Sequence, residues 1–218
     1  MSIIAMDPEL AGKVRLGIFQ AEGLTARGTS PELEQDLEAL TRRIAQAYEA
    51  PAAAVELFQP ARELYRALGL DPTKTRPSSE ALIRRVIKGT GLYRINRVVD
   101  TCNYCSIALA LSIGLYDTAA VRWPVVLRRG RAGEGYGGLG KDHVSVAGRY
   151  ALVDELGPFG NPSSDSFRTR IREETTACTF VLFAPASYGE ARLRAELADC
   201  AQRMVRYNEG RVTLQEIV

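Results

Sequence analysis

Apolar residues recur with helical spacing through most of the first half of the chain. After Ser30 and Pro31, a typical helix start, one face of the segment to residue 48 carries Leu33, Leu37, Leu40, Ile44 and Tyr48. Capping and turn residues predict further helices that begin at Pro60, Ser78 and Asn96 and end at Gly69, Gly89 and Ser112–Gly114. A short β-branched and aromatic run predicts one strand at 14–21. The first half is therefore expected to be mainly helical.

Short apolar runs without helical spacing dominate the second half. They predict strands, in chain order, at 124–128, 144–147, 150–156 and 176–184. The middle two are expected to form a hairpin that turns near Gly148, and the last reads as a central strand because it is apolar throughout. Residues 157–166 are turn-forming types, and 190–207 predicts a final amphipathic helix. This order predicts an α+β fold, with helices outside a mixed sheet.

The composition is that of an ordinary globular protein, with 46% hydrophobic and 25% charged residues among 218. We expect one domain over residues 1–218, because a chain of this length can bury one sizeable core. The sequence lacks an apolar run of about 20 residues and a signal-peptide pattern, so neither membrane insertion nor export is expected. Four cysteines do not make a disulfide scaffold at this size, which favours the cytoplasm. The formal charge of +2 is too small to indicate a partner.

A basic stretch between residues 74 and 97 is the first candidate for chemistry, because Glu80 is its only acid. Clustered cations suit phosphate binding, since each neutralised phosphate releases counterions. The predicted phosphate-binding residues are Arg76, Arg84, Arg85, Lys88, Arg94 and Arg97. A solvated helix face would show the same pattern, and both interpretations stay open.

Three further sequence features indicate chemistry less clearly than this stretch does. The basic, Gly-rich segment 129–140 favours a mobile surface loop, although Tyr136 in such a loop could stack on a base. Cys102 and Cys105 have the spacing of a metal or redox motif but fall in the middle of a predicted helix, so no metal or cofactor is predicted. His143, the only histidine, favours a surface or structural role over acid–base chemistry.

Two polar residues, Asp100 and Asn103, share one face of the predicted helix at 96–111. Apolar residues surround them, and a buried carboxylate is costly unless it is hydrogen-bonded. These side chains therefore either anchor neighbouring backbone or face a pocket.

The region around them resembles the editing domain, the B3/B4 domain, of the phenylalanyl-tRNA synthetase beta chain. The resemblance rests on RINRVVD at 94–100, NY at 103–104, LYD at 115–117 and IREETT at 171–176. The segment 73–91 resembles freestanding proteins that consist of this domain alone. It implies an editing-like core over 73–218, to which 1–72 adds an N-terminal strand and helices.

The resemblance also implies a three-layer arrangement of sheets and helices around a pocket for an amino acid ester at a tRNA 3′ end. In the synthetase this domain hydrolyses tyrosine wrongly attached to the phenylalanine tRNA. Asn103 matches a pocket asparagine and Cys102 a pocket threonine. Gly114 falls where the synthetase carries a pocket histidine, and the pocket glutamate falls near Val181, where no acid stands. The expected pocket residues are Cys102, Asn103, Gly114, Asp100 and Tyr116.

Two functions follow as hypotheses. The first is a tRNA-editing-like domain that binds aminoacyl-tRNA or a related aminoacyl ligand; any hydrolysis would use a water held by backbone groups and Asn103, and no catalytic side chain is assigned. The second is a small-molecule or protein-binding module that kept the fold and lost the tRNA role. If Arg84, Arg85, Lys88 and Arg97 share one face beside the pocket, the first gains; if they point apart, the second gains. The oligomeric state stays open.

Overall fold

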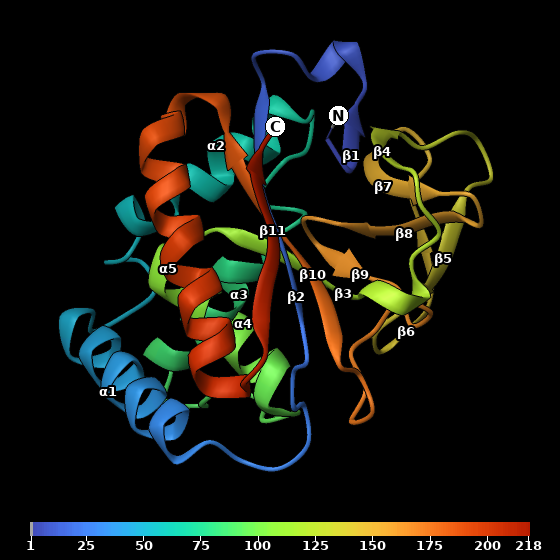
Figure 1. The fold of residues 1–218 in the computed structure, drawn as a ribbon. Coiled ribbons are helices and arrows are strands. Elements are labelled where there is room, and N and C mark those ends of the chain that lie inside the picture. Colours follow the sequence, from blue (N-terminus) through green and yellow to red (C-terminus); the bar gives the residue numbers. More distant parts are fainter. Residues whose placement is uncertain (1) are drawn as a thin grey trace.

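The computed structural model describes residues 2–218, which form an α+β fold of three layers (Figure 1). The middle layer is a four-stranded antiparallel sheet in the order β11-β2-β10-β3. Its strands are β2 (Val14–Glu22), β3 (Ser112–Asp117), β10 (Ala177–Pro185) and β11 (Arg211–Ile217). Helices α4 (Arg97–Leu109) and α5 (Glu190–Asn208) cover one face of this sheet, and a second sheet covers the other.

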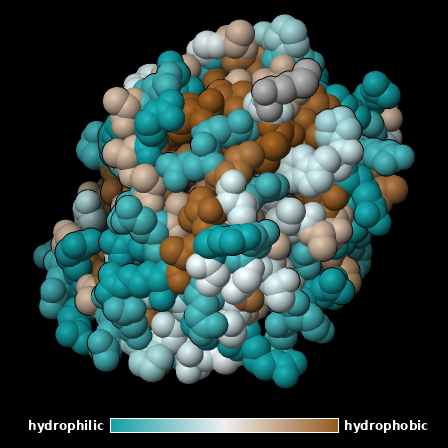
Figure 2. Space-filling view, viewed as in Figure 1, coloured by the Kyte–Doolittle hydropathy of each residue, from teal (hydrophilic) through white to brown (hydrophobic). Residues whose placement is uncertain are grey.

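Strand β10 is apolar throughout because both of its faces are covered. Phe180 and Leu182 point to the core under α4 and α5, whereas Val181 and Phe183 point to the core against the second sheet. The predicted central position of this strand is confirmed. In Figure 2, the helical side of the same view is mostly hydrophilic, as expected where α5 turns its polar face to solvent.

The second sheet has the strand order β1-β4-β7-β8-β9. Its strands are β1 (Ile4–Met6), β4 (Val125–Arg129), β7 (Tyr150–Asp154), β8 (Gly157–Asn161) and β9 (Ser164–Asp165). A separate hairpin of β5 (Gly135–Gly138) and β6 (Lys141–Ser145) lies beside it at the right of Figure 1. The short strand β9 lies next to β3, so the two sheets meet along that edge.

Two of the remaining helices, α1 (Pro31–Ala47) and α3 (Ser78–Ile87), form their own core against α4. Helix α2 (Gln59–Ala67) packs on β10 instead, and its Leu64 and Tyr65 belong to the core against the second sheet. The predicted stripe of α1 is buried, and the Ser30 hydroxyl accepts a hydrogen bond from the Leu33 amide at 3.4 Å. At the start of α4, Asn96 Oδ1 accepts from the Val99 amide at 3.0 Å. The predicted caps of α1 and α4 are therefore both confirmed. Within residues 2–218, no helix is both long and apolar enough to cross a membrane.

Three local predictions were wrong. Ser78 is the first residue of α3 rather than its cap, and its hydroxyl donates to the carbonyl of Pro162. The helix ends at Leu109, and Ser112–Asp117 forms a strand, so Gly114 is no helix stop. The predicted hairpin around Gly148 is absent because β6 pairs with β5, while β7 pairs with β4 and β8.

The segment interpreted as turns throughout, 157–166, contains β8 and β9. Its glycines and prolines predict turns, but Gly160 lies in β8, where the strand packs closely against the buried ring of Tyr116. The Gly-rich segment 129–140 is likewise not wholly a mobile loop, because it contributes the ordered strand β5.

A candidate ligand site between beta3 and beta9

The ring of Tyr116 fills the space that two glycines leave open. An added Cβ at Gly114, two residues away on the same face of β3, would overlap the Tyr116 hydroxyl and lie 2.7 Å from Tyr116 Cζ. An added Cβ at Gly160 of β8 would overlap the same hydroxyl from the other side. Phe159 packs edge-on against the ring, with 4.9 Å between centroids. The hydroxyl of Tyr116 thus occupies the space into which a side chain at position 114 would project.

That hydroxyl donates to a carboxylate. Tyr116 Oη lies 2.7 Å from Asp165 Oδ1, and the Leu115 amide at the open edge of β3 lies 3.5 Å from Asp165 Oδ2. As a residue Asp165 keeps some solvent exposure, whereas its carboxyl group lies inside. Burial raises the pKa of Asp165 to about 7, because the hydrogen bonds from Tyr116 and Leu115 offset the loss of solvent only in part. Burial raises the pKa of Tyr116 well above its usual range, so its hydroxyl stays a donor.

A second polar group fixes the backbone that carries Asp165. Asn161 Oδ1 accepts from the amides of Ser163 and Ser164 at 2.8 and 3.0 Å. Its amide nitrogen donates to Tyr136 Oη at 3.0 Å, and Tyr136 in turn donates to the Ser164 carbonyl at 2.6 Å. Tyr136 is only 8% exposed, so the base-stacking role considered for this ring is wrong. The network instead holds the 161–165 turn, and with it Asp165, against β3.

Cys102 lies beside this site on α4. Burial raises the pKa of its thiol well above the usual range, with smaller effects of the same sign from Cys105 and Asp165. A thiol in these surroundings stays protonated and is a poor nucleophile. All four cysteines are buried and free, and within residues 2–218 no group of three or more His, Cys, Asp or Glu side chains is arranged to hold a metal ion.

The predicted pocket residues divide into two groups. Gly114 and Tyr116 come together at Asp165. Cys102 packs in the core under α4 and α5, near enough for Asp165 to contribute to the raised pKa of its thiol. Asp100 does not join them: its carboxylate accepts from Arg94 Nε at 2.8 Å and from the Ile95 amide at 3.1 Å, which anchors the chain before α4. Asn103 is half-buried one position after Cys102, and its side chain makes no hydrogen bond within the described part of the chain.

The predicted phosphate-binding residues contact different partners within the protein. Glu80 Oε1 lies 2.7 Å from Arg84 Nε and 3.9 Å from Arg76 Nε, and Arg62 of α2 also pairs with the Glu80 carboxylate. Arg85 stacks on Tyr93 with 4.0 Å to the ring centroid, and Arg97 donates to the carbonyl of Tyr207. Arg84, Arg85 and Arg97 therefore point apart. Lys88 is exposed, and no ion pair involves it within residues 2–218.

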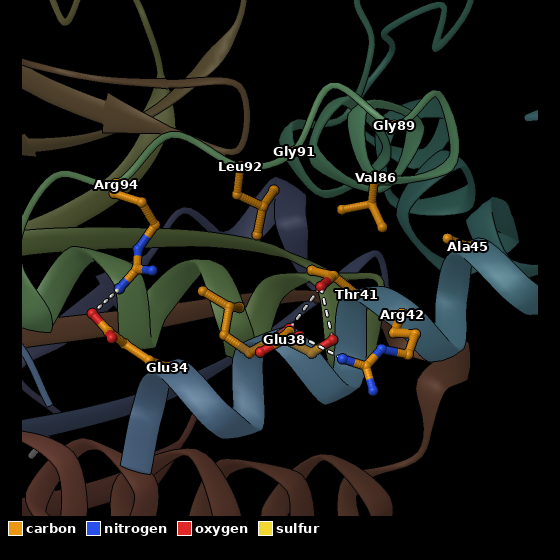
Figure 3. Close-up of a pocket in the computed structure, with 11 residues that line it drawn as sticks. Glu34, Glu38, Thr41, Arg42, Ala45, Val86, Gly89, Gly91, Leu92 and Arg94 are labelled. Carbon is orange, nitrogen blue, oxygen red and sulfur yellow. Dashed lines mark hydrogen bonds and ion pairs between the residues drawn. The ribbon is translucent and has the colours of Figure 1, made fainter. Parts of the chain in front are cut away.

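Arg94 lines a groove of about 520 Å³ between α1 and the segment that joins α3 to α4 (Figure 3). Across this groove its guanidinium reaches Glu34 at 3.4 Å, while Arg42 pairs with Glu38 on the same helix. Leu37, Val86 and Leu92 line the groove between these charges. Because acids and bases neutralise one another here, the groove offers little net charge to a phosphate.

Asp165 was missed from the sequence. It is the only charged residue in GPFGNPSSDS (157–166), a segment interpreted as turn throughout. A single acid in an otherwise apolar and turn-forming segment is the sequence feature that could have identified it as a site residue. Its partner Tyr116 is 49 positions away in the chain, and their contact follows only from the pairing of the two sheet edges.

A family model described as the B3/4 domain matches residues 60–217. Among solved structures, the chain is similar to an N-terminal fragment of the phenylalanyl-tRNA synthetase beta-subunit from Pyrococcus horikoshii, with 11% sequence identity and a TM-score of 0.47. The alignment covers 99% of this chain and 53% of that one, so the chain spans about half of the fragment's length. None of the curated proteins matches the chain.

Proposed function

The chain belongs to the B3/4 domain family, and on this premise we propose that it binds the aminoacyl end of an aminoacyl-tRNA, or a related aminoacyl ligand, at Asp165. The observation that carries the proposal is a carboxyl group enclosed between two sheet edges, with no arginine or lysine in ion-pair distance among residues 2–218. Such a group has unused capacity for a proton, a water molecule or an ammonium group.

The same carboxyl suits hydrolysis of the ester. A general base works best when its pKa lies near the working pH, and the pKa of Asp165 is about 7. In the hydrolytic step, ionised Asp165 takes a proton from a water molecule as the water oxygen bonds to the ester carbonyl carbon. The ribose oxygen then leaves and takes up that proton, which yields a free amino acid and tRNA. In this proposal Asn103, whose side chain makes no hydrogen bond among residues 2–218, orients the ligand or the water.

Gly114 falls where the synthetase carries a pocket histidine. The missing side chain at that position leaves room for the Tyr116 hydroxyl, which supplies a polar group in the same space. An acid from another strand takes the place of the glutamate expected near Val181, since Asp165 is hydrogen-bonded to Tyr116.

We extend the proposal to the whole chain as one domain in the cytoplasm. Strand β2 lies between β10 and β11, and β1 pairs with β4, so the N-terminal residues belong to the same sheets as the matched region. The cytoplasm is where aminoacyl-tRNA is made and where four free thiols stay reduced.

The test is deacylation of tyrosine misattached to phenylalanine tRNA, measured for the wild type and for Asp165→Asn. We expect the wild type to exceed the spontaneous rate and the variant to lose at least tenfold. Glu155→Gln, an exposed acid on the turn after β7, is the matched control and should retain the full rate. Spontaneous rates for all three proteins, with no binding of an aminoacyl-adenosine analogue, would remove the proposal.

The second candidate is a binding module without hydrolysis. It is favoured by the tight enclosure of the site, where Tyr116 is 1% and Cys102 7% exposed, and by the separate partners of Arg84, Arg85 and Arg97. This candidate predicts that the aminoacyl-adenosine analogue binds, that Asp165→Asn abolishes the binding, and that the ester stays intact.

A further inference from the structure

The outward face of β6 carries a row of polar and basic side chains. Lys141, His143 and Ser145 alternate along the strand and are all exposed, whereas Val144 points inward to the small core around Tyr136. Together with Arg149 they line a hollow of about 340 Å³. This face therefore concentrates positive charge that the deeper site lacks.

One glycine of the neighbouring strand leaves its backbone open. Over Gly135, which pairs with Ser145, the space is filled by His143, since an added Cβ would lie 2.6 Å from His143 Nε2. An added Cβ at Gly137 would meet only the carbonyl of Asp142, at 3.7 Å. A ligand can thus approach the β5 backbone closely at Gly137.

Lys141 and Arg149 are cations without an ion-pair partner. Within residues 2–218 neither they nor His143 form an ion pair, although most arginines of the chain do. The exposed Asp142 lies between Lys141 and His143 in β6, where strand alternation turns it to the opposite face. Arg128 and Arg129, in β4, are held by Glu134 and Glu9. Phosphate binding needs unpaired cations, because a guanidinium already held by a carboxylate gains little from exchanging it for a phosphate.

The hairpin is joined directly to the strand that carries Asp165. The Leu139 amide donates to the Asp165 carbonyl at 3.1 Å, and the Phe167 amide donates to the Gly137 carbonyl at 2.8 Å. Phe167 is 54% exposed, and Arg170 stacks on its ring with 3.5 Å to the centroid. An exposed aromatic ring two residues from Asp165, on a segment hydrogen-bonded to the hairpin, fits a ligand that has bases as well as phosphates.

We propose that the outward face of β6, with Phe167, holds the phosphates and one base of the single-stranded 3′ end of the tRNA whose aminoacyl group enters at Asp165. The proposal rests on the proposed function and names the surface that receives its RNA. It places the phosphate contacts at Lys141, His143 and Arg149 rather than in the basic stretch 74–97.

The test uses a fluorescent RNA hairpin that copies a tRNA acceptor stem with its single-stranded 3′ end. Its affinity is measured by anisotropy over a series of salt concentrations for the wild type, K141A/R149A and K13A/R43A. K13A/R43A is the control. It removes two exposed cations that lie outside β6 and form no ion pair among the described residues, so both double variants lose the same charge. Unfolding midpoints check that each variant is folded.

We expect K141A/R149A to reduce the magnitude of the slope of log affinity against log salt by about 1.4, because each of two single-strand phosphate contacts contributes about 0.7. K13A/R43A should leave the slope unchanged. F167A should weaken RNA binding about tenfold but leave binding of an inorganic polyphosphate unaffected, which separates an RNA end from phosphate alone.

Equal slopes for the two double variants, with RNA still bound, would overturn this inference and leave the proposed function standing. If the wild type fails to bind the hairpin but binds the aminoacyl-adenosine analogue, the surface assignment is also wrong and the ligand is not tRNA. If neither ligand binds, the proposed function itself fails.

Discussion

Glu80 and Asp165 are two carboxylates set among packed side chains, and their partners differ. Glu80 is 1% exposed and receives hydrogen bonds from Arg62 at 2.7 and 2.8 Å and from Arg84 at 2.7 Å. Burial alone would raise its pKa, but the two arginines outweigh burial and leave the pKa lowered. Asp165 has a tyrosine hydroxyl and a backbone amide instead, and burial raises its pKa to about 7.

The contrast separates structure from function. An acid satisfied by arginines is stabilised as an ion and has no capacity left for a ligand. An ionised acid held only by neutral donors carries a desolvation cost in the folded protein. A bound cation or a proton reduces that cost. A basic residue near an acid in sequence is therefore a poor guide to phosphate binding, as Arg84 and Arg94 illustrate.

Removing the charge at Glu80 should have the largest effect on stability. Glu80→Gln leaves Arg62 and Arg84 partly buried without a counterion, which we expect to cost about 3–5 kcal/mol of unfolding free energy. Urea unfolding at pH 7 measures it. Glu38→Gln, in an exposed pair with Arg42, is the control and should change little. Equal losses in both variants would mean that the Glu80 cluster is no more than a surface pair.

Asp165→Asn should stabilise the protein, and by an amount that depends on pH. The folded pKa of about 7 lies above the ordinary value of 3.8, so the folded state binds more protons than the unfolded state between these values. Wild-type stability from this group is therefore complete below about pH 4 and is lost as the pH rises to about 7. The variant should gain up to about 4 kcal/mol over the wild type at pH 8 and almost nothing at pH 4.

The measurement is the unfolding free energy of both proteins in urea from pH 4 to 8. Taking the difference between them cancels the contribution of other groups, such as Glu80. A difference that stays constant across this range would show that Asp165 has an ordinary pKa, and would weaken the comparison with Glu80.

Gly114→Ala should have the smallest of the three stability effects. The added methyl group overlaps the Tyr116 hydroxyl and must displace the ring, at a cost of about 1–3 kcal/mol. Gly137→Ala, where a methyl group has room and the backbone is ordinary, is the matched control. Thermal unfolding compares them. If Gly114→Ala is as stable as its control, the close packing of Tyr116 against β3 is wrong.

The helices of this chain follow from the sequence more directly than its second sheet. Caps and apolar spacing are local, so Ser30, Asn96 and the buried face of α1 could be predicted from neighbouring residues. Strands β8 and β9 could not, because Gly160 and Asp165 are selected by contacts with Tyr116, more than 40 positions earlier. Asp165 was absent from the predicted site residues for the same reason, because its contact with Tyr116 is distant in the chain. Asp100 could be interpreted as an anchor because its partners Arg94 and Ile95 are close in the chain.

The pH dependence of deacylation tests the role of Asp165 most directly. In single-turnover experiments on misacylated tRNA, corrected for spontaneous hydrolysis, we expect the wild-type rate to rise with pH and level off above about 7, as Asp165 becomes ionised. Asp165→Asn should lose most of the rate and the inflection with it. A variant that keeps both the wild-type rate and its inflection would contradict the assignment of Asp165 as the acid–base group of this domain.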